Sequence, residues 1–143
     1  MYDAILIPTD GSEASTAAVD QGVELAARFD ATVHFLSVVD IGTEMSASAV
    51  GDIADDLTAT LETVATDALE AATARAEAAG VAHERTIFEG FPHETIAAYV
   101  ADHDIDLVVM GASGRSGLTD RLLGSTTDRV TRSVDVSVLV ARP

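Results

Sequence analysis

The chain has 143 residues, of which 48% are hydrophobic, so it can form one domain with a buried core and needs no second one. It carries 24 acidic residues against eight arginines, has no lysine and bears a formal net charge of −16, which disfavours nucleic acid as a partner. The absence of cysteine excludes disulfides and thiolate metal sites, and no apolar run approaches the roughly 20 residues of a membrane span. We expect a cytoplasmic protein, whose acidity without lysine resembles that of proteins from salt-loving cells.

Apolar strands and amphipathic helices alternate along the chain. Ser12 is the expected cap of the first helix, Pro92 suits a first helical turn, and Gly80 can end a long helical stripe. Residues 40–52 show no clear periodicity and predict a loop. The expected strands cover residues 2–9, 32–39, 81–88, 107–110 and 136–141, and the expected helices cover 13–29, 53–79, 93–102 and 125–133. This alternation predicts an α/β fold, with a parallel sheet covered by helices on both faces.

The stretch GASGRSGLTDRLLGST, residues 111–126, is the most informative part of the sequence because it joins an apolar strand to a helix. Gly111, Gly114 and Gly117 punctuate the loop, and Gly124 stands where the helix should begin. Glycines let backbone N–H groups approach an anion, and a helix N-terminus adds unpaired donors. The stretch therefore predicts a phosphate-binding loop. The alternatives are that Gly111 and Gly114 simply end a strand and that Gly124 is needed only for close helix packing.

A second loop, PTDGS at residues 8–12, leaves the first strand. In an open parallel sheet, ligands bind beyond the carboxyl ends of the strands where the strand order reverses, so this loop and the glycine loop could face one crevice. A carboxylate at Asp10 would repel phosphates, and it fits better as the acceptor for an adenine amino group or a ribose hydroxyl. The alternative is that Asp10 only forms the turn or caps the helix.

Four of the eight arginines lie in or just after the glycine loop: Arg115, Arg121, Arg129 and Arg132. Each of them could simply pair with a nearby carboxylate on a solvated face. Arg115 is the better candidate for an anion contact, because it lies between two glycines and could fold over a phosphate.

The spacing Gly111, two residues, Gly114, nine residues, Gly124-Ser125 resembles the nucleotide-binding signature of the universal stress proteins. PTDGS, SVVD, EGFPHE and SVLVARP also look like that family, in the same order and at compatible spacing, so the resemblance covers nearly the whole chain. It implies an open five-stranded parallel sheet of order 3-2-1-4-5, a Rossmann-like fold similar to that of the adenine nucleotide alpha hydrolases. It also implies a stress-response role and, frequently, a homodimer.

The resemblance to the ATP-binding subset of this family implies a site for adenine nucleotide. The matching positions are Pro8, Thr9 and Asp10 for the base and ribose, Val38 for the adenine, Met110 and Gly111 for the ribose and phosphate entrance, and Gly114, Arg115, Gly124, Ser125 and Thr126 for the phosphates. Val38 and Met110 also fit core positions. The implied ligand is ATP, or AMP or ADP, with any Mg²⁺ or Mn²⁺ carried by the phosphates.

Motifs for catalysis are absent from the sequence. It contains no GxxxxGK[ST], no GxSxG and no HExxH, so we assign no catalytic residue and no protein metal site. The expected function is a nucleotide-binding regulatory protein. Two alternatives stay open, namely a weak ATPase and a nucleotide-free dimer that acts through partner proteins.

The last strand gives a physical reason to expect a dimer. Residues Val136 to Ala141 would form a short apolar edge of the sheet unless another chain covers them. Pairing with a second copy satisfies that edge, and the resemblance implies the same interface.

Overall fold

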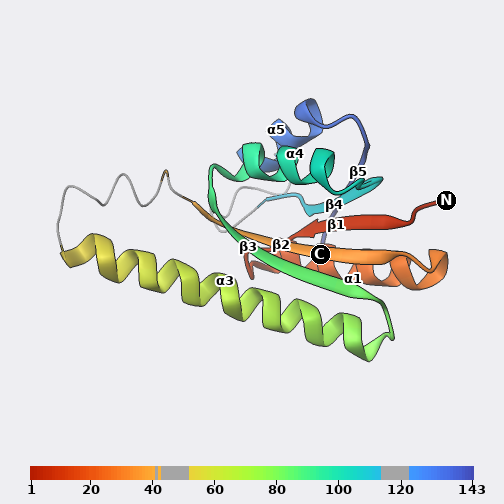
Figure 1. Ribbon diagram of the computed structural model, residues 1–143, viewed down its shortest axis with the longest axis horizontal. Helices are drawn as coiled ribbons and strands as arrows, with labels where there is room; N and C mark the ends of the chain where they lie inside the picture. Colours follow the sequence, from red (N-terminus) through yellow and green to blue (C-terminus); the bar gives the residue numbers. More distant parts are fainter. Residues whose placement is uncertain (41, 43–51, 114–122) are drawn as a thin grey trace.

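A five-stranded parallel sheet of order β3-β2-β1-β4-β5 forms the centre of the molecule (Figure 1). The computed structural model describes residues 1–40, 42, 52–113 and 123–143. The strands are β1 (Ala4–Pro8), β2 (Thr32–Asp40), β3 (His83–Gly90), β4 (Leu107–Gly111) and β5 (Ser137–Ala141). The α/β fold and the strand order implied by the sequence are confirmed.

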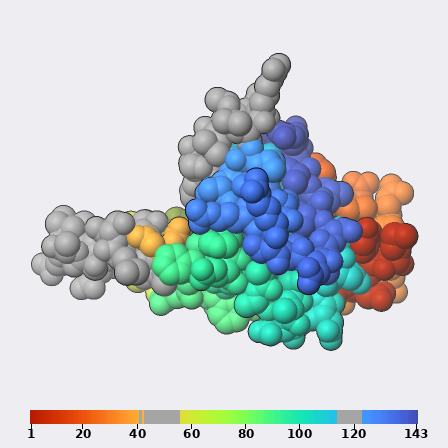
Figure 2. All heavy atoms as spheres, turned by 90° about the horizontal axis from the view of Figure 1, so that it is seen from above, coloured from red at the N-terminus to blue at the C-terminus, as the bar shows by residue number. Residues whose placement is uncertain are grey.

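Helices cover both faces of this sheet. On one face lie α1 (Glu13–Phe29) and α3 (Asp52–Ala78), which close a core that contains Ile5, Ile7 and Phe35. On the other face α4 (Pro92–Asp102) and α5 (Ser125–Ser133) lie side by side (Figure 2) and close a second core around Leu6 and Leu36. Alternate residues of each strand thus enter opposite cores, as the pleat requires. No helix in the described ranges is long and apolar enough to cross a membrane.

The ends of the helices follow the predicted local chemistry. The Ser12 side chain accepts the Ser15 N–H at 3.2 Å and caps α1, and Pro92 occupies the start of α4. Gly80 follows α3 with a φ of 69°, a left-handed conformation that glycine adopts without strain. These three residues therefore delimit helices in the way the sequence indicates.

The third strand is the clearest difference from the sequence-based expectation, because it begins and ends two residues later than residues 81–88. The Val81 N–H donates to the Ala76 carbonyl at 3.0 Å, so this residue still belongs to the capping of α3. At the other end, Glu89 and Gly90 pair with Val39 and Asp40 and extend both strands. Residues 41, 43–51 and 114–122 lie outside the described residues, and with them most of the expected loop over 40–52.

β1 is shorter than both of its neighbours at the carboxyl end of the sheet. Its pairing with β2 ends at Pro8 and Leu36, although β2 continues beside β3 to Asp40. Its pairing with β4 ends at Leu6 and Val108, although β4 continues beside β5 to Gly111. The sheet therefore opens above the end of β1, at the point where the strand order reverses.

Candidate functional site

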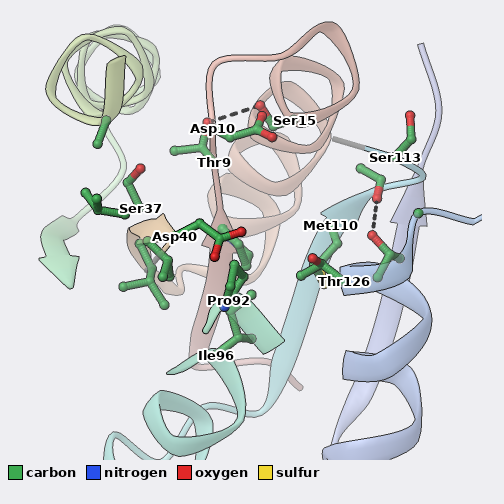
Figure 3. Close-up of a pocket in the computed structure, with 18 of the residues that line it drawn as sticks. Thr9, Asp10, Ser15, Ser37, Asp40, Pro92, Ile96, Met110, Ser113 and Thr126 are labelled. Atoms are coloured by element: carbon green, nitrogen blue, oxygen red, sulfur yellow. Dashed lines mark hydrogen bonds between the residues drawn. The ribbon is translucent and has the colours of Figure 1, made fainter. Parts of the chain in front are cut away.

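A pocket of about 460 Å³ lies at this opening (Figure 3). It takes residues from the ends of β1, β2 and β4, from α3 and α4, and from the start of α5. Nine of the eleven sequence-predicted site residues line it: Pro8, Thr9, Asp10, Val38, Met110, Gly111, Gly124, Ser125 and Thr126. The other two, Gly114 and Arg115, lie outside the described residues. The two loops singled out in the sequence thus meet at one cavity.

The turn after β1 brings Thr9 and Asp10 to the pocket. The Thr9 hydroxyl donates to the Ser15 hydroxyl at 3.3 Å, and the Ser15 hydroxyl donates to the Ser12 carbonyl at 3.0 Å. One carboxylate oxygen of Asp10 accepts the Ser12 N–H at 2.9 Å, the usual bond of an aspartate in a turn. The turn-forming role considered for Asp10 is thus present, and it fixes the carboxylate beside the cavity.

β2 offers backbone groups to the pocket beyond the end of β1. The Thr9 N–H donates to the Leu36 carbonyl at 2.9 Å, whereas the Val33 N–H donates to Ala82 of the opposite neighbour. Since successive peptide groups of a strand point to opposite sides, Val38 directs its N–H and carbonyl to the same side as Leu36. The described part of the chain pairs no strand with Val38 on that side. A donor and an acceptor therefore stand next to each other at the pocket.

The end of β4 is packed directly against the start of α1. A Cβ atom added at Gly111 would lie 2.6 Å from the Ala14 carbonyl carbon and oxygen and 2.8 Å from the Ala14 Cβ. No side chain fits there without a shift of the backbone. From the sequence alone, the end of the strand is the alternative reason for Gly111, and the packing of its backbone against α1 accounts for this glycine independently of any ligand.

The N-terminus of α5 opens onto the pocket without a side-chain cap. Gly124 occupies the cap position with extended backbone, and this residue makes no side-chain capping bond because glycine has no side chain. The first intrahelical bond runs from the Asp128 N–H to the Gly124 carbonyl at 2.9 Å. The preceding N–H groups, those of Ser125, Thr126 and Thr127, have no acceptor within the helix. This end of the helix suits an anion, whereas the corresponding end of α1 is capped by Ser12.

Apolar side chains close the pocket on two sides. Leu61, Val64 and Ala65 approach from α3, and Pro92 and Ile96 approach from α4. Figure 3 shows Pro92 and Ile96 below the opening, with Met110 and Thr126 on the side of β4 and α5. A flat apolar ring could lie between these walls while its edge meets the backbone of β2.

The charged side chains in the described lining are Asp10 and Asp40. An Asp40 carboxylate oxygen accepts the Gly42 N–H at 2.9 Å. Arg132 pairs with Asp128 at 3.3 Å, which is the surface role considered for it, and neither Arg129 nor Arg132 lines the pocket. Among the described residues, no group of three histidine or acidic side chains could hold a metal ion.

Sequence reasoning did not assign five polar residues of the pocket to the site: Ser15, Ser37, Asp40, Ser113 and Thr127. Asp40 ends the SVVD segment, which contributes to the resemblance but does not by itself predict a contact with a ligand. Ser37 is 3% exposed and lies between apolar residues of β2, and the sequence gives no sign that this strand extends beyond the end of β1. Thr127 follows the glycine and serine of the signature but carries no motif of its own.

Comparison with known proteins agrees with this architecture. The model of the universal stress protein family matches residues 1–142. Universal stress protein MJ0531 of Methanocaldococcus jannaschii is 34% identical over 99% of this chain and 83% of its own length. The solved structure of MJ0577 from the same organism superposes with a TM-score of 0.88 at 29% identity, covering 100% of this chain and 97% of that one.

A second solved structure, a universal stress protein in complex with cAMP, has a TM-score of 0.72 at 27% identity and covers 99% of this chain and 97% of that one. The family match spans almost the whole sequence, and the relatives are matched over most of their length. The chain therefore belongs to the universal stress protein family.

Proposed function

We propose that this protein is a stress-response regulator that binds an adenine nucleotide, with ATP, ADP or AMP as the ligand, between the PTDGS turn and the start of α5. The proposed contacts are those named from the sequence: Pro8, Thr9, Asp10, Val38, Met110, Gly111, Gly114, Arg115, Gly124, Ser125 and Thr126. The binding of cAMP by a relative supports an adenine nucleotide as the ligand class.

The observation that carries the proposal is the adjacent N–H and carbonyl of Val38, which point to the open side of β2. Adenine presents a ring-nitrogen acceptor beside an amino donor, so it complements this pair. Hypoxanthine and guanine present the reverse order, a ring N–H beside a carbonyl oxygen. The backbone of Val38 would therefore select adenine, whatever the side chains around it.

The other end of the ligand would meet the start of α5. The N–H groups of Ser125, Thr126 and Thr127, which have no acceptor within α5, and the helix dipole favour a phosphate there. A divalent ion would be carried mainly by the phosphates, with the carboxylates of Asp10 and Asp40 nearby in the described lining. The charged side chains of the described lining, Asp10 and Asp40, each accept a backbone N–H of their own turn, and we therefore propose binding rather than turnover.

Two further features belong to this proposal. The protein would form a homodimer through the exposed edge of β5, and its acidic surface would be suited to a cytoplasm rich in salt. The position of β5 at the edge of the sheet supports the homodimer, and the net charge of −16 supports the adaptation to salt.

Calorimetric titration with AMP and with IMP tests the base assignment. The two ligands carry the same phosphate and ribose, and they differ only at the base edge that Val38 would contact. AMP should bind about 10- to 100-fold more tightly, because IMP leaves the donor and the acceptor unpaired. Equal affinities would contradict the assignment of the base to β2.

The phosphate assignment is tested with Ser125→Pro and Ser125→Ala. Proline is well tolerated at the first helical position. Ser125→Pro removes both the hydroxyl and the N–H group, whereas Ser125→Ala removes the hydroxyl and retains the N–H, so the difference between the two variants reports on the N–H group. The extended backbone of Gly124, with ψ near 154°, is compatible with a following proline. AMP affinity should fall about tenfold in Ser125→Pro relative to Ser125→Ala. If the two variants bind AMP equally, the α5 amides do not hold the phosphate.

A further inference from the structure

We infer that Thr127 is a positioning residue, which fixes the phosphate-facing end of α5 by anchoring it to the last carbonyl of β4. This inference rests on the proposed function. Thr127 is 3% exposed, and its hydroxyl donates to the Gly111 carbonyl at 2.8 Å. The bond joins the first turn of the helix to the strand across the glycine-rich segment.

A second bond acts at the same junction. The Gly124 N–H donates to the Ala112 carbonyl at 2.7 Å, so the cap residue of α5 is tied to the residue after β4. With two bonds to consecutive carbonyls, the start of the helix is held in both position and direction. The side-chain bond of Thr127 can be removed by a substitution that leaves the backbone unchanged, whereas the bond of Gly124 is made by its backbone N–H.

The Gly111 carbonyl needs this partner because of the strand arrangement. The Ala112 N–H donates to the Ala141 carbonyl of β5 at 3.2 Å, so the Gly111 carbonyl points to the opposite side, toward β1. The β1 pairing has ended by then, at Leu6 and Val108. Thr127 thus satisfies a buried acceptor that the sheet leaves without a strand partner.

Gly111 is also a firm anchor. Its backbone lies against Ala14 so closely that a Cβ atom would meet the Ala14 carbonyl at 2.6 Å. The hydrogen bond of Thr127 therefore fixes the position of the phosphate-binding helix end relative to α1 and the sheet. Val38, which would read the base, belongs to β2 on the other side of β1 and does not depend on this bond.

Thr127→Val tests the inference because valine has nearly the same shape but no hydroxyl. Calorimetric titration with AMP and with adenosine separates the two ends of the ligand. AMP binding should weaken about tenfold while adenosine binding stays within about twofold of the parent value. Thr127→Ser should restore AMP binding, since serine keeps the donor.

The outcomes discriminate between the possible roles. Unchanged AMP affinity in a folded Thr127→Val, or equal losses for AMP and adenosine, would overturn the positioning role and leave Thr127 with a merely structural one. If Thr127→Val does not fold, Thr127→Ala takes its place, because its smaller side chain leaves room for water at the Gly111 carbonyl. Absence of binding of both ligands by the parent would overturn the proposed function itself, and this inference with it.

Discussion

His34 and Tyr99 form a buried polar pair on the face of the sheet that α4 covers. His34 Nδ1 lies 2.8 Å from the Tyr99 hydroxyl, and the Tyr99 ring stacks on His103 with 3.8 Å between centroids. Burial lowers the pKa of His34, the Glu84 carboxylate at 3.6 Å opposes this, and His103 adds to it. Burial also raises the pKa of Tyr99. A neutral histidine that accepts from a neutral tyrosine hydroxyl fits these shifts.

Acidification should destabilise the protein through His34. Because the folded-state pKa lies below the ordinary 6.5, the unfolded chain takes up this proton first. The contribution is fully present above the ordinary value and is lost as the pH falls below it toward the folded-state value. Surface carboxylates titrate as well, so the informative quantity is the difference from His34→Gln, whose amide oxygen can still accept from Tyr99.

The measurement is the thermal midpoint of both proteins at about pH 8 and about pH 5. The parent should lose more of its midpoint than His34→Gln over this range. Parallel losses would show that His34 does not couple folding to pH.

At the scale of elements, the sequence predicts what depends on local pattern and misses what depends on register. Apolar periodicity, the Ser12 cap and Pro92 place the helices well, because those signals act within a few residues. The start of the third strand was misplaced because the Val81 N–H completes α3 instead. β1 ends before both of its neighbours, which leaves the backbone of Val38 without a strand partner among the described residues and the Gly111 carbonyl to be bonded by Thr127. This early end is a property of strand pairing, and no single segment of the sequence encodes it.

The edge strand β5 carries the prediction of dimerisation. Among the described strands β5 pairs with β4 alone, and the N–H and carbonyl of Val140 face away from β4, because Ala141 faces it. A second β5 strand could bond to that edge. Val140→Pro would remove an outward N–H group and block pairing without touching the ladder to β4, while Val140→Thr retains it.

Sedimentation velocity at micromolar concentration in high salt distinguishes a dimer from a monomer. The parent and Val140→Thr should sediment as dimers, and Val140→Pro as a monomer. High salt is needed because two chains of the same negative charge repel each other. A monomeric parent, or a dimeric Val140→Pro, would rule out the β5 interface.

At the scale of the whole molecule, the excess of negative charge affects the stability of the fold. With 24 acidic residues against eight arginines, most carboxylates have no basic partner to pair with. The described arginine pairs, Arg28–Glu24, Arg75–Asp20 and Arg132–Asp128, are all substantially exposed, and such pairs contribute little. Repulsion between carboxylates therefore opposes folding at low ionic strength.

Salt should stabilise this protein by screening that repulsion. The Debye length shrinks from more than 10 Å to about 3 Å as the salt rises from about 0.05 M to about 1 M, so most of the gain should come below 1 M. We expect the thermal midpoint at neutral pH to rise over this range and then to level off, with sodium chloride and potassium chloride acting alike.

Near pH 4, where many carboxylates are protonated, the same salt series should raise the midpoint much less. A rise that continues linearly beyond 1 M, or that is equally large at pH 4, would instead indicate exclusion of salt from the protein surface. A flat midpoint at neutral pH would mean that the net charge does not limit stability.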